Sequence, residues 1–134
     1  MEEEVKPLET DVHQLSPAVW AYIGDAVYEL AMRVFTLREG PKRMNQMHKD
    51  TARFVTATFQ ARASHVLEAY LTEQELDILR RGRNSKSGHV PRSASPGEYR
   101  LSTGLEGLIG YLYLTGRHER LDELMAILRR VGEE

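Results

Sequence analysis

The chain has 134 residues, with 18 basic and 20 acidic side chains, a formal net charge of −2 and no cysteine. This length favours one domain with a real hydrophobic core, and the lack of cysteine excludes disulfides, thiolate metal sites and thiol nucleophiles. No apolar run is long enough to span a membrane, and the N-terminus lacks the basic and apolar regions of a signal peptide. We therefore expect a soluble, cytoplasmic protein without a membrane partner.

The basic side chains are concentrated in one segment. Residues 80–100 hold six basic side chains and one acid, which leaves 12 basic and 19 acidic residues elsewhere. The chain is therefore clearly acidic outside this segment and basic within it. A basic segment of this kind indicates contact with a nucleic acid.

The first long helix is predicted at residues 16–37, after an acidic arm at residues 1–14. Ser16 is a suitable N-cap, and proline is tolerated at the next position. Apolar residues at helical spacing predict a broad buried stripe: Val19, Trp20, Ile23, Ala26, Val27, Leu30, Val34 and Phe35.

The opposite face of this helix is small and aromatic and carries only two acids, Asp25 and Glu29. Because so little of the helix is polar, we expect it to be buried on both sides. Carboxylates on such a face need a partner, which can be a cation, an arginine or a metal.

More helices are predicted along the rest of the chain. One apolar period runs from Pro41 to about Ala63, and a short helical stretch covers residues 64–70. Thr72 with Glu75 is a capping-box signature, and the helix that it opens is expected to end at Gly82.

Residues 84–97 are rich in serine, glycine and proline and predict a long loop. Helices are then expected at residues 99–116 and 120–131, and no strand pattern is found, so the fold class is all-α. The first of these two helices contains Gly104, Gly107 and Gly110, each of which costs about 1 kcal/mol relative to alanine. Such a cost indicates that another helix or a ligand approaches this backbone closely.

Two acids, Asp25 and Glu106, each lie mid-helix among apolar or small residues. Hard divalent cations such as magnesium bind carboxylate oxygens, and a metal held in this way can activate water and stabilise charge on a phosphoryl group. Together with the basic loop, they indicate metal-dependent hydrolysis of a polynucleotide. From spacing alone, ion pairs between these acids and arginines explain the pattern about equally well.

Four stretches together resemble the Mini-ribonuclease III family, compact bacterial relatives of ribonuclease III: residues 21–29 (AYIGDAVYE), 47–49 (MHK), 79–88 (LRRGRNSKSG) and 99–114 (YRLSTGLEGLIGYLYL). The resemblance runs from about Leu15 to Arg130. It implies a ribonuclease III endonuclease-domain-like helical bundle at residues 15–132, which is dimeric and has no separate RNA-binding domain. It also implies cleavage of double-stranded RNA with divalent metal, usually magnesium and alternatively manganese.

The resemblance assigns the site residue by residue. Asp25 matches the catalytic aspartate and Glu106 the metal-binding glutamate, so both are expected to bind the metal. Two further acids of ordinary ribonuclease III are replaced by Ala21 and Thr103, in the way Mini-III proteins replace them. We therefore expect one tightly held ion, and Glu29 receives no assigned role.

The resemblance further implies that two protomers share one RNA-binding valley and that the substrate is large-subunit (23S) ribosomal RNA precursor. A ribosomal protein that presents this RNA is a further partner that we consider. The predicted RNA-binding residues are Arg83, Asn84, Lys86, Ser87, Arg92, Arg100, His48 and Lys49.

Two other classes of function stay open at this point. Because of Ala21 and Thr103, the chain can be an inactive RNA-binding or ribosome-assembly module with the same fold. It can also be a helical protein-interaction dimer in which Asp25 and Glu106 pair with arginines.

Overall fold

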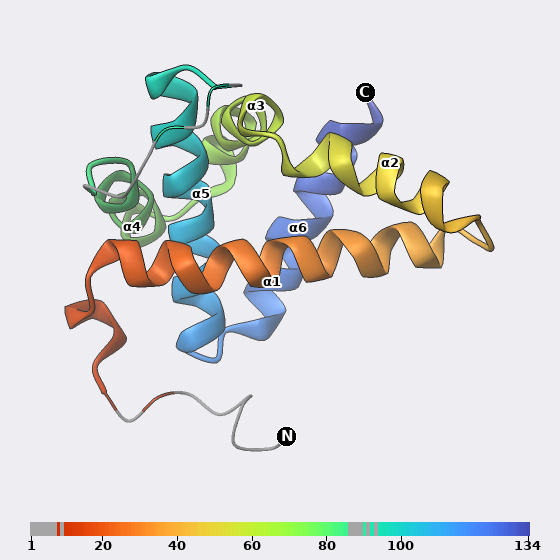
Figure 1. Ribbon diagram of the computed structural model, residues 1–134. Helices are drawn as coiled ribbons and strands as arrows, with labels where there is room; N and C mark the ends of the chain where they lie inside the picture. The colour runs from red at the N-terminus through yellow and green to blue at the C-terminus, as the bar shows by residue number, and fades with distance from the viewer. Residues whose placement is uncertain (1–7, 9, 86–89, 91, 93) are drawn as a thin grey trace.

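The computed structural model describes residue 8, residues 10–85, residues 90 and 92, and residues 94–134. Over these residues the chain is all-α, as predicted, and no strand is found in them (Figure 1). The helices are α1 (Pro17–Arg38), α2 (Met44–Val55), α3 (Ala57–Leu67), α4 (Glu73–Arg83), α5 (Pro96–Leu114) and α6 (His118–Glu133), with the 3-10 turns η2 (Val12–Gln14) and η3 (Glu68–Tyr70). In the part of the chain that the structure describes, none of them has the length and apolar character of a membrane span.

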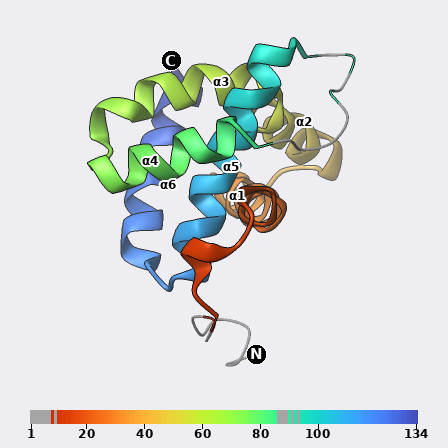
Figure 2. The ribbon, with the colours of Figure 1, turned by 90° about the vertical axis from the view of Figure 1, so that its left-hand side faces the viewer.

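Helix α5 is the centre of the bundle. It packs against α1, α3 and α4, and Figures 1 and 2 show it enclosed by these helices. Its residues from Ser102 to Leu112 are all buried except Glu106, which is half-buried. A helix that is covered on all sides must be apolar or small all round, which explains the composition of this segment.

Helices α1 and α5 cross in direct backbone contact. A Cβ atom added to Gly24 would lie 1.6 Å from the carbonyl oxygen of Glu106, and one added to Gly110 would lie 1.8 Å from the carbonyl oxygen of Trp20. Helix α4 approaches α5 in a similar way, where Gly82 faces Gly104. Gly104 and Gly110 of α5 therefore mark the close approach of neighbouring helices.

The face of α1 that enters the core matches the predicted stripe only in part: Trp20 is buried, and Val27 and Phe35 pack against the core. Its buried residues lie on one face, spaced about one helical turn apart except for the adjacent pair at the start: Trp20, Ala21, Gly24, Tyr28, Met32 and Thr36. Val19 and Leu30, which were predicted to be buried, are exposed. The prediction failed because the helix carries two apolar faces, and only contact with α5 decides which of them is covered.

The predicted helix from Pro41 to Ala63 is two helices. Helix α2 begins at Met44, and the chain is extended at Thr56, between α2 and α3. The hydroxyl of Thr56 accepts a hydrogen bond from the backbone N–H of Phe59 at 3.1 Å and caps α3. The predicted caps at Ser16 and at Thr72 with Glu75 are both observed.

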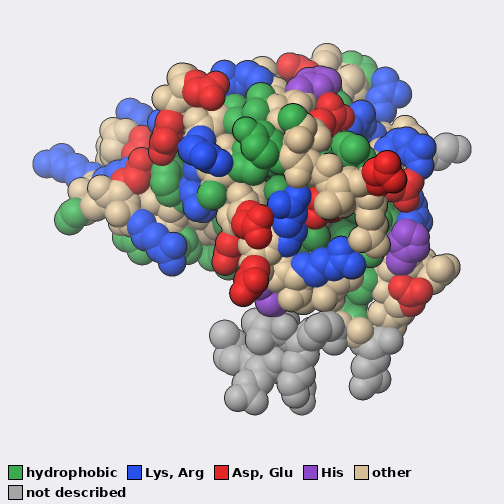
Figure 3. All heavy atoms as spheres, turned by 180° about the vertical axis from the view of Figure 1, so that it is seen from behind, with side chains coloured by type: hydrophobic (Ala, Val, Ile, Leu, Met, Phe, Trp, Pro, Cys, Tyr) green, Lys and Arg blue, Asp and Glu red, His purple; other side chains and the backbone are tan. Residues whose placement is uncertain are grey.

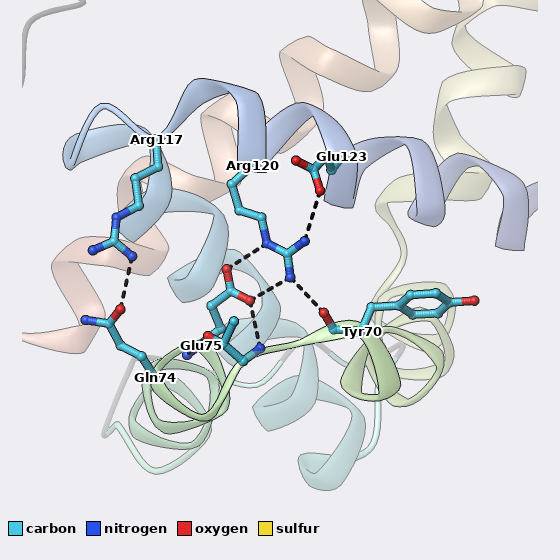
Figure 4. Close-up of polar contacts among 7 residues, drawn as sticks. Tyr70, Gln74, Glu75, Arg117, Arg120 and Glu123 are labelled. Atoms are coloured by element: carbon cyan, nitrogen blue, oxygen red, sulfur yellow. Dashed lines mark hydrogen bonds and ion pairs between the residues drawn. The ribbon is translucent and has the colours of Figure 1, made fainter.

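An arginine clamp joins α6 to α4 (Figure 4). Arg120 donates two hydrogen bonds of 2.8 Å to the carboxylate of Glu75, and it donates a third to the carbonyl oxygen of Tyr70 at 2.7 Å. Glu75 is buried and also accepts from the backbone N–H of Thr72. The two-pronged geometry satisfies a carboxylate that would otherwise be costly to bury.

Part of the predicted N-terminal arm packs against the bundle. The indole N–H of Trp20 donates to the carbonyl oxygen of Val12 at 2.8 Å, and Arg81 lies over the Trp20 ring. Residues 1–7 and 9 of the predicted arm lie outside the described residues. The domain boundary at residues 14 and 15 stays a prediction.

Candidate active site

The crossing of α1 and α5 brings Asp25 and Glu106 together. Gly24 precedes Asp25 and touches the backbone of Glu106, so the two acids lie side by side where the helices meet. Both line a cleft of about 630 Å³. The other walls come from the junction of α2 and α3, from the N-terminal half of α5 and from the end of the loop before it: Val55, Thr56, Ala57, Thr58, Gln60, Ala94, Tyr99 and Ser102.

The electrostatics of this pair are unfavourable without a cation. Burial raises the pKa of the Glu106 carboxyl from its ordinary value of 4.5 to about 8, and the neighbouring Asp25 adds to the rise. Two like charges at close range favour protonation of one of them. A divalent cation between the two carboxylates would relieve the same repulsion, so the donor set fits a hard metal ion.

Of the residues that the structure describes, Asp25 and Glu106 are the only carboxylates that line the cleft. No group of three or more acidic, histidine or cysteine side chains that could hold a metal occurs among the described residues. Ala21 is buried in α1, and the hydroxyl of Thr103 donates to the carbonyl oxygen of Tyr99 at 2.9 Å. Glu29 forms an ion pair with Arg33 at 2.8 Å, one turn further along α1.

Gln60 also belongs to the site, although it was not predicted from the sequence. Its side chain is 3 % exposed and lines the cleft with the two acids. It lies against both Glu106 and Tyr28, and hydrogen bonding by Gln60 opposes the burial-driven rise in the pKa of each. The only signal in the sequence was an amide at helical spacing from buried residues of the same helix, Ala63 and Leu67.

The predicted RNA-binding residues are scattered over three parts of the chain. Asn84, at the end of α4, and Arg92 and Arg100 are exposed, as are His48 and Lys49 on α2. Lys86 and Ser87 lie outside the described residues.

Arg83 is already engaged within the protein. Its guanidinium forms an ion pair with Glu68, and its stem packs against Gly104 of α5. Its Nε atom is buried without a hydrogen-bond partner.

The sequence model of the ribonuclease III domain matches residues 18–117, which include both acids of the cleft. The chain belongs to the ribonuclease III family. It is 50 % identical over 111 residues to the Mini-ribonuclease 3 of Symbiobacterium thermophilum, a match that covers 83 % of this chain and 85 % of that one. It is 42 % identical to the Mini-ribonuclease 3 of Clostridium tetani, over 92 % of this chain and 83 % of that one.

A solved structure has the same fold over most of the chain. The crystal structure of a Fusobacterium nucleatum protein superimposes with a TM-score of 0.82 at 29 % identity, covering 91 % of this chain and 99 % of that one. As a member of the ribonuclease III family, the chain is an endoribonuclease. The family acts on double-stranded RNA.

Proposed function

We propose that this ribonuclease III family member is a divalent-metal-dependent homodimer that cleaves double-stranded RNA and matures large-subunit ribosomal RNA precursors in the cytoplasm. Asp25 and Glu106 are its catalytic residues and hold magnesium, with manganese as the alternative ion. The proposal depends above all on one observation. Two carboxylates from distant motifs meet in a single cleft, beside the crossing of two helices.

The charges of the site indicate separate roles for the metal ion and for the two carboxylates. A bound divalent ion would activate water for attack on phosphorus and would offset the negative charge that develops on the phosphate. Asp25 and Glu106 hold the ion, and Glu106 must lose its proton to do so, since its pKa in the empty site is about 8. With only these two carboxylates as protein ligands, a bound ion would leave positions that water and RNA phosphate oxygens could fill.

An unpartnered apolar stripe on α1 supports the dimer. None of the helices that the structure describes covers the outer side of α1, which Figure 2 shows nearly end-on. The stripe consists of Val19, Tyr22, Leu30 and Leu37, with Tyr22 79 % and Leu30 64 % exposed. The opposite side of the molecule instead carries acidic and basic side chains interspersed (Figure 3). Exposed apolar stripes of this kind mark interfaces, and Asp25 lies at the border of this one.

Exposed basic and polar residues around the cleft support RNA as the substrate. Arg92 and Arg100 lie in the segments that contain the cleft residues Ala94 and Tyr99. His48 and Lys49 project from α2, whose last residue also lines the cleft. We propose that these side chains and the segment around Lys86 and Ser87 contact the phosphates of the duplex, where shape is read rather than sequence. Because these contacts are few, we propose that a ribosomal protein also helps to present the RNA to the cleft.

The direct test compares wild type with Asp25→Asn and Glu106→Gln in a cleavage assay at low salt. The substrates are a perfect RNA duplex and the terminal stem of a 23S precursor, each with magnesium or with chelator. Changes around metal ligands cost about 10–100-fold, so loss of one of only two carboxylates should reduce cleavage by about 100-fold or more. Asp122→Asn, on α6 away from the cleft, is the matched control and should cut at the wild-type rate.

Each alternative has its own outcome. Equal cleavage by wild type and Asp25→Asn would refute the assigned site. Salt-sensitive duplex binding without any magnesium-dependent cleavage by wild type would favour the inactive RNA-binding module, an alternative motivated by Ala21 and Thr103. No preference for the 23S stem over the perfect duplex would remove the argument for precursor maturation.

A further inference from the structure

A buried amide lies beside the two carboxylates of the cleft. Gln60 comes from α3, a helix that contributes neither Asp25 nor Glu106, yet it lines the same cleft and is 3 % exposed. Burial of an amide is costly unless hydrogen bonds satisfy it. Its neighbours at this point are Glu106 and Tyr28.

The hydrogen bonds around Tyr28 determine which end of the amide faces these neighbours. The Tyr28 hydroxyl donates to the backbone carbonyl oxygen of Phe54, and a carbonyl oxygen can only accept. The single hydroxyl proton is therefore used, and the Tyr28 oxygen can only accept from Gln60. A carboxylate likewise accepts, so the NH₂ group of Gln60, with its two donors, is the end that serves both Tyr28 and Glu106.

We propose that Gln60 is a positioning residue, whose NH₂ group is anchored on the Tyr28 oxygen and holds the Glu106 carboxylate in place beside Asp25. This inference rests on the proposed metal-dependent cleavage. A site with only two carboxylates depends strongly on the orientation of each, and hydrogen bonds to ligands from a second layer of residues supply such orientation. The Phe54 carbonyl that ends this chain of contacts belongs to α2 close to its junction with α3, so the anchor is tied to a wall of the cleft.

The test uses two substitutions at this position. Gln60→Glu keeps the size of the side chain and an oxygen but removes the NH₂ donors, while Gln60→Ala removes the whole group. The matched control is Gln46→Ala, because Gln46 also donates to a carboxylate, Asp50, at 2.8 Å, but lies outside the cleft. Mn²⁺ binding is measured without RNA, and kcat and KM are measured on a duplex with magnesium. Thermal unfolding shows whether each variant is folded.

Both Gln60 variants should bind Mn²⁺ about 10-fold more weakly and lose about 10–100-fold in kcat, with KM for the duplex unchanged. Gln46→Ala should match wild type in all of these measurements. Unchanged Mn²⁺ affinity and kcat in a folded Gln60→Glu would overturn the inference, because the amide would then only fill space. Tighter Mn²⁺ binding by Gln60→Glu would also overturn it, since the Gln60 oxygen would then be a metal ligand.

The same measurements separate this inference from the proposed function. If Asp25→Asn binds Mn²⁺ as wild type does, the metal site itself is misassigned and the inference falls with it. If Asp25→Asn loses Mn²⁺ but the Gln60 variants do not, the metal site stands and only the positioning role is refuted.

Discussion

At the scale of single residues, Glu106 carries the strongest electrostatic consequence of the fold. Backbone contact between two helices places its carboxyl beside that of Asp25. Burial and this neighbour raise its pKa from 4.5 to about 8. The protonated form is therefore favoured in the metal-free folded protein at neutral pH.

This shift predicts how stability depends on pH. Because Glu106 binds its proton more tightly when folded than when unfolded, its contribution is fully present below pH 4.5 and is lost as pH rises through about 8. The free energy of unfolding of the metal-free protein should thus fall over this window, and Glu106→Gln should flatten that part of the profile. Chemical denaturation at a series of pH values in chelator measures this, and a wild-type profile parallel to that of Glu106→Gln would contradict it.

Metal binding should show the reverse trend. A cation competes with the proton on Glu106, so Mn²⁺ affinity should rise as pH increases toward 8, and binding should release protons. Titration in buffers of different ionisation enthalpy measures the number of protons released. Binding without proton release at pH 7 would mean that Glu106 is not a ligand.

At the scale of helices, the α1–α5 crossing both builds the core and forms the site. The crossing is possible only because Gly24 and Gly110 lack side chains. At both positions an added methyl group would contact backbone atoms of the facing helix. Backbone cannot change rotamer to make room, as a flexible side chain can.

Gly110→Ala should therefore separate the helices or unfold the domain. Overpacking of this kind costs at least about 2 kcal/mol, and any folded fraction should lose metal affinity because Glu106 moves with α5. The control is Gly97→Ala in the first turn of the same helix, where an added Cβ meets nothing closer than Ser95 Oγ at 4.0 Å. That change should leave stability equal or raise it by about 0.5–1 kcal/mol. Equal denaturation midpoints for the two variants would refute the tight crossing.

At the scale of the whole molecule, the exposed stripe on α1 is the surface through which we propose that two protomers associate. It is apolar, lies on the side of the bundle that none of the described helices covers, and borders the cleft at Asp25. Association through this stripe would bring two cleavage sites near one duplex.

Tyr22→Glu should convert the proposed dimer to a monomer, because it places a charge where apolar surface is buried against the partner. Tyr70→Glu is the matched control, since Tyr70 is also an exposed tyrosine, at 54 %, but lies on η3 away from α1. Sedimentation velocity over a range of concentrations measures the mass of each variant. A dimeric Tyr22→Glu, or a monomeric wild type, would remove this interface.

The sequence alone determined those features that depend on residues close together along the chain. Ser16, and Thr72 with Glu75, cap helices through hydrogen bonds to residues two or three positions away, so neighbouring letters suffice to predict them. The helical class follows from the apolar spacing in the same way, and the motif resemblance supplied the family and the candidates Asp25 and Glu106.

Only the tertiary structure decided which surfaces meet. Leu30 and Tyr28 are equally plausible core residues by spacing, yet contact with distant helices buries only Tyr28. The approach of Gln60 to Glu106 also arises from packing between elements. Hydrogen bonds within a turn depend on adjacent residues, so a short stretch of sequence is enough to predict them. Burial depends on which element, distant in the sequence, packs against a given face, and this is determined by the whole chain.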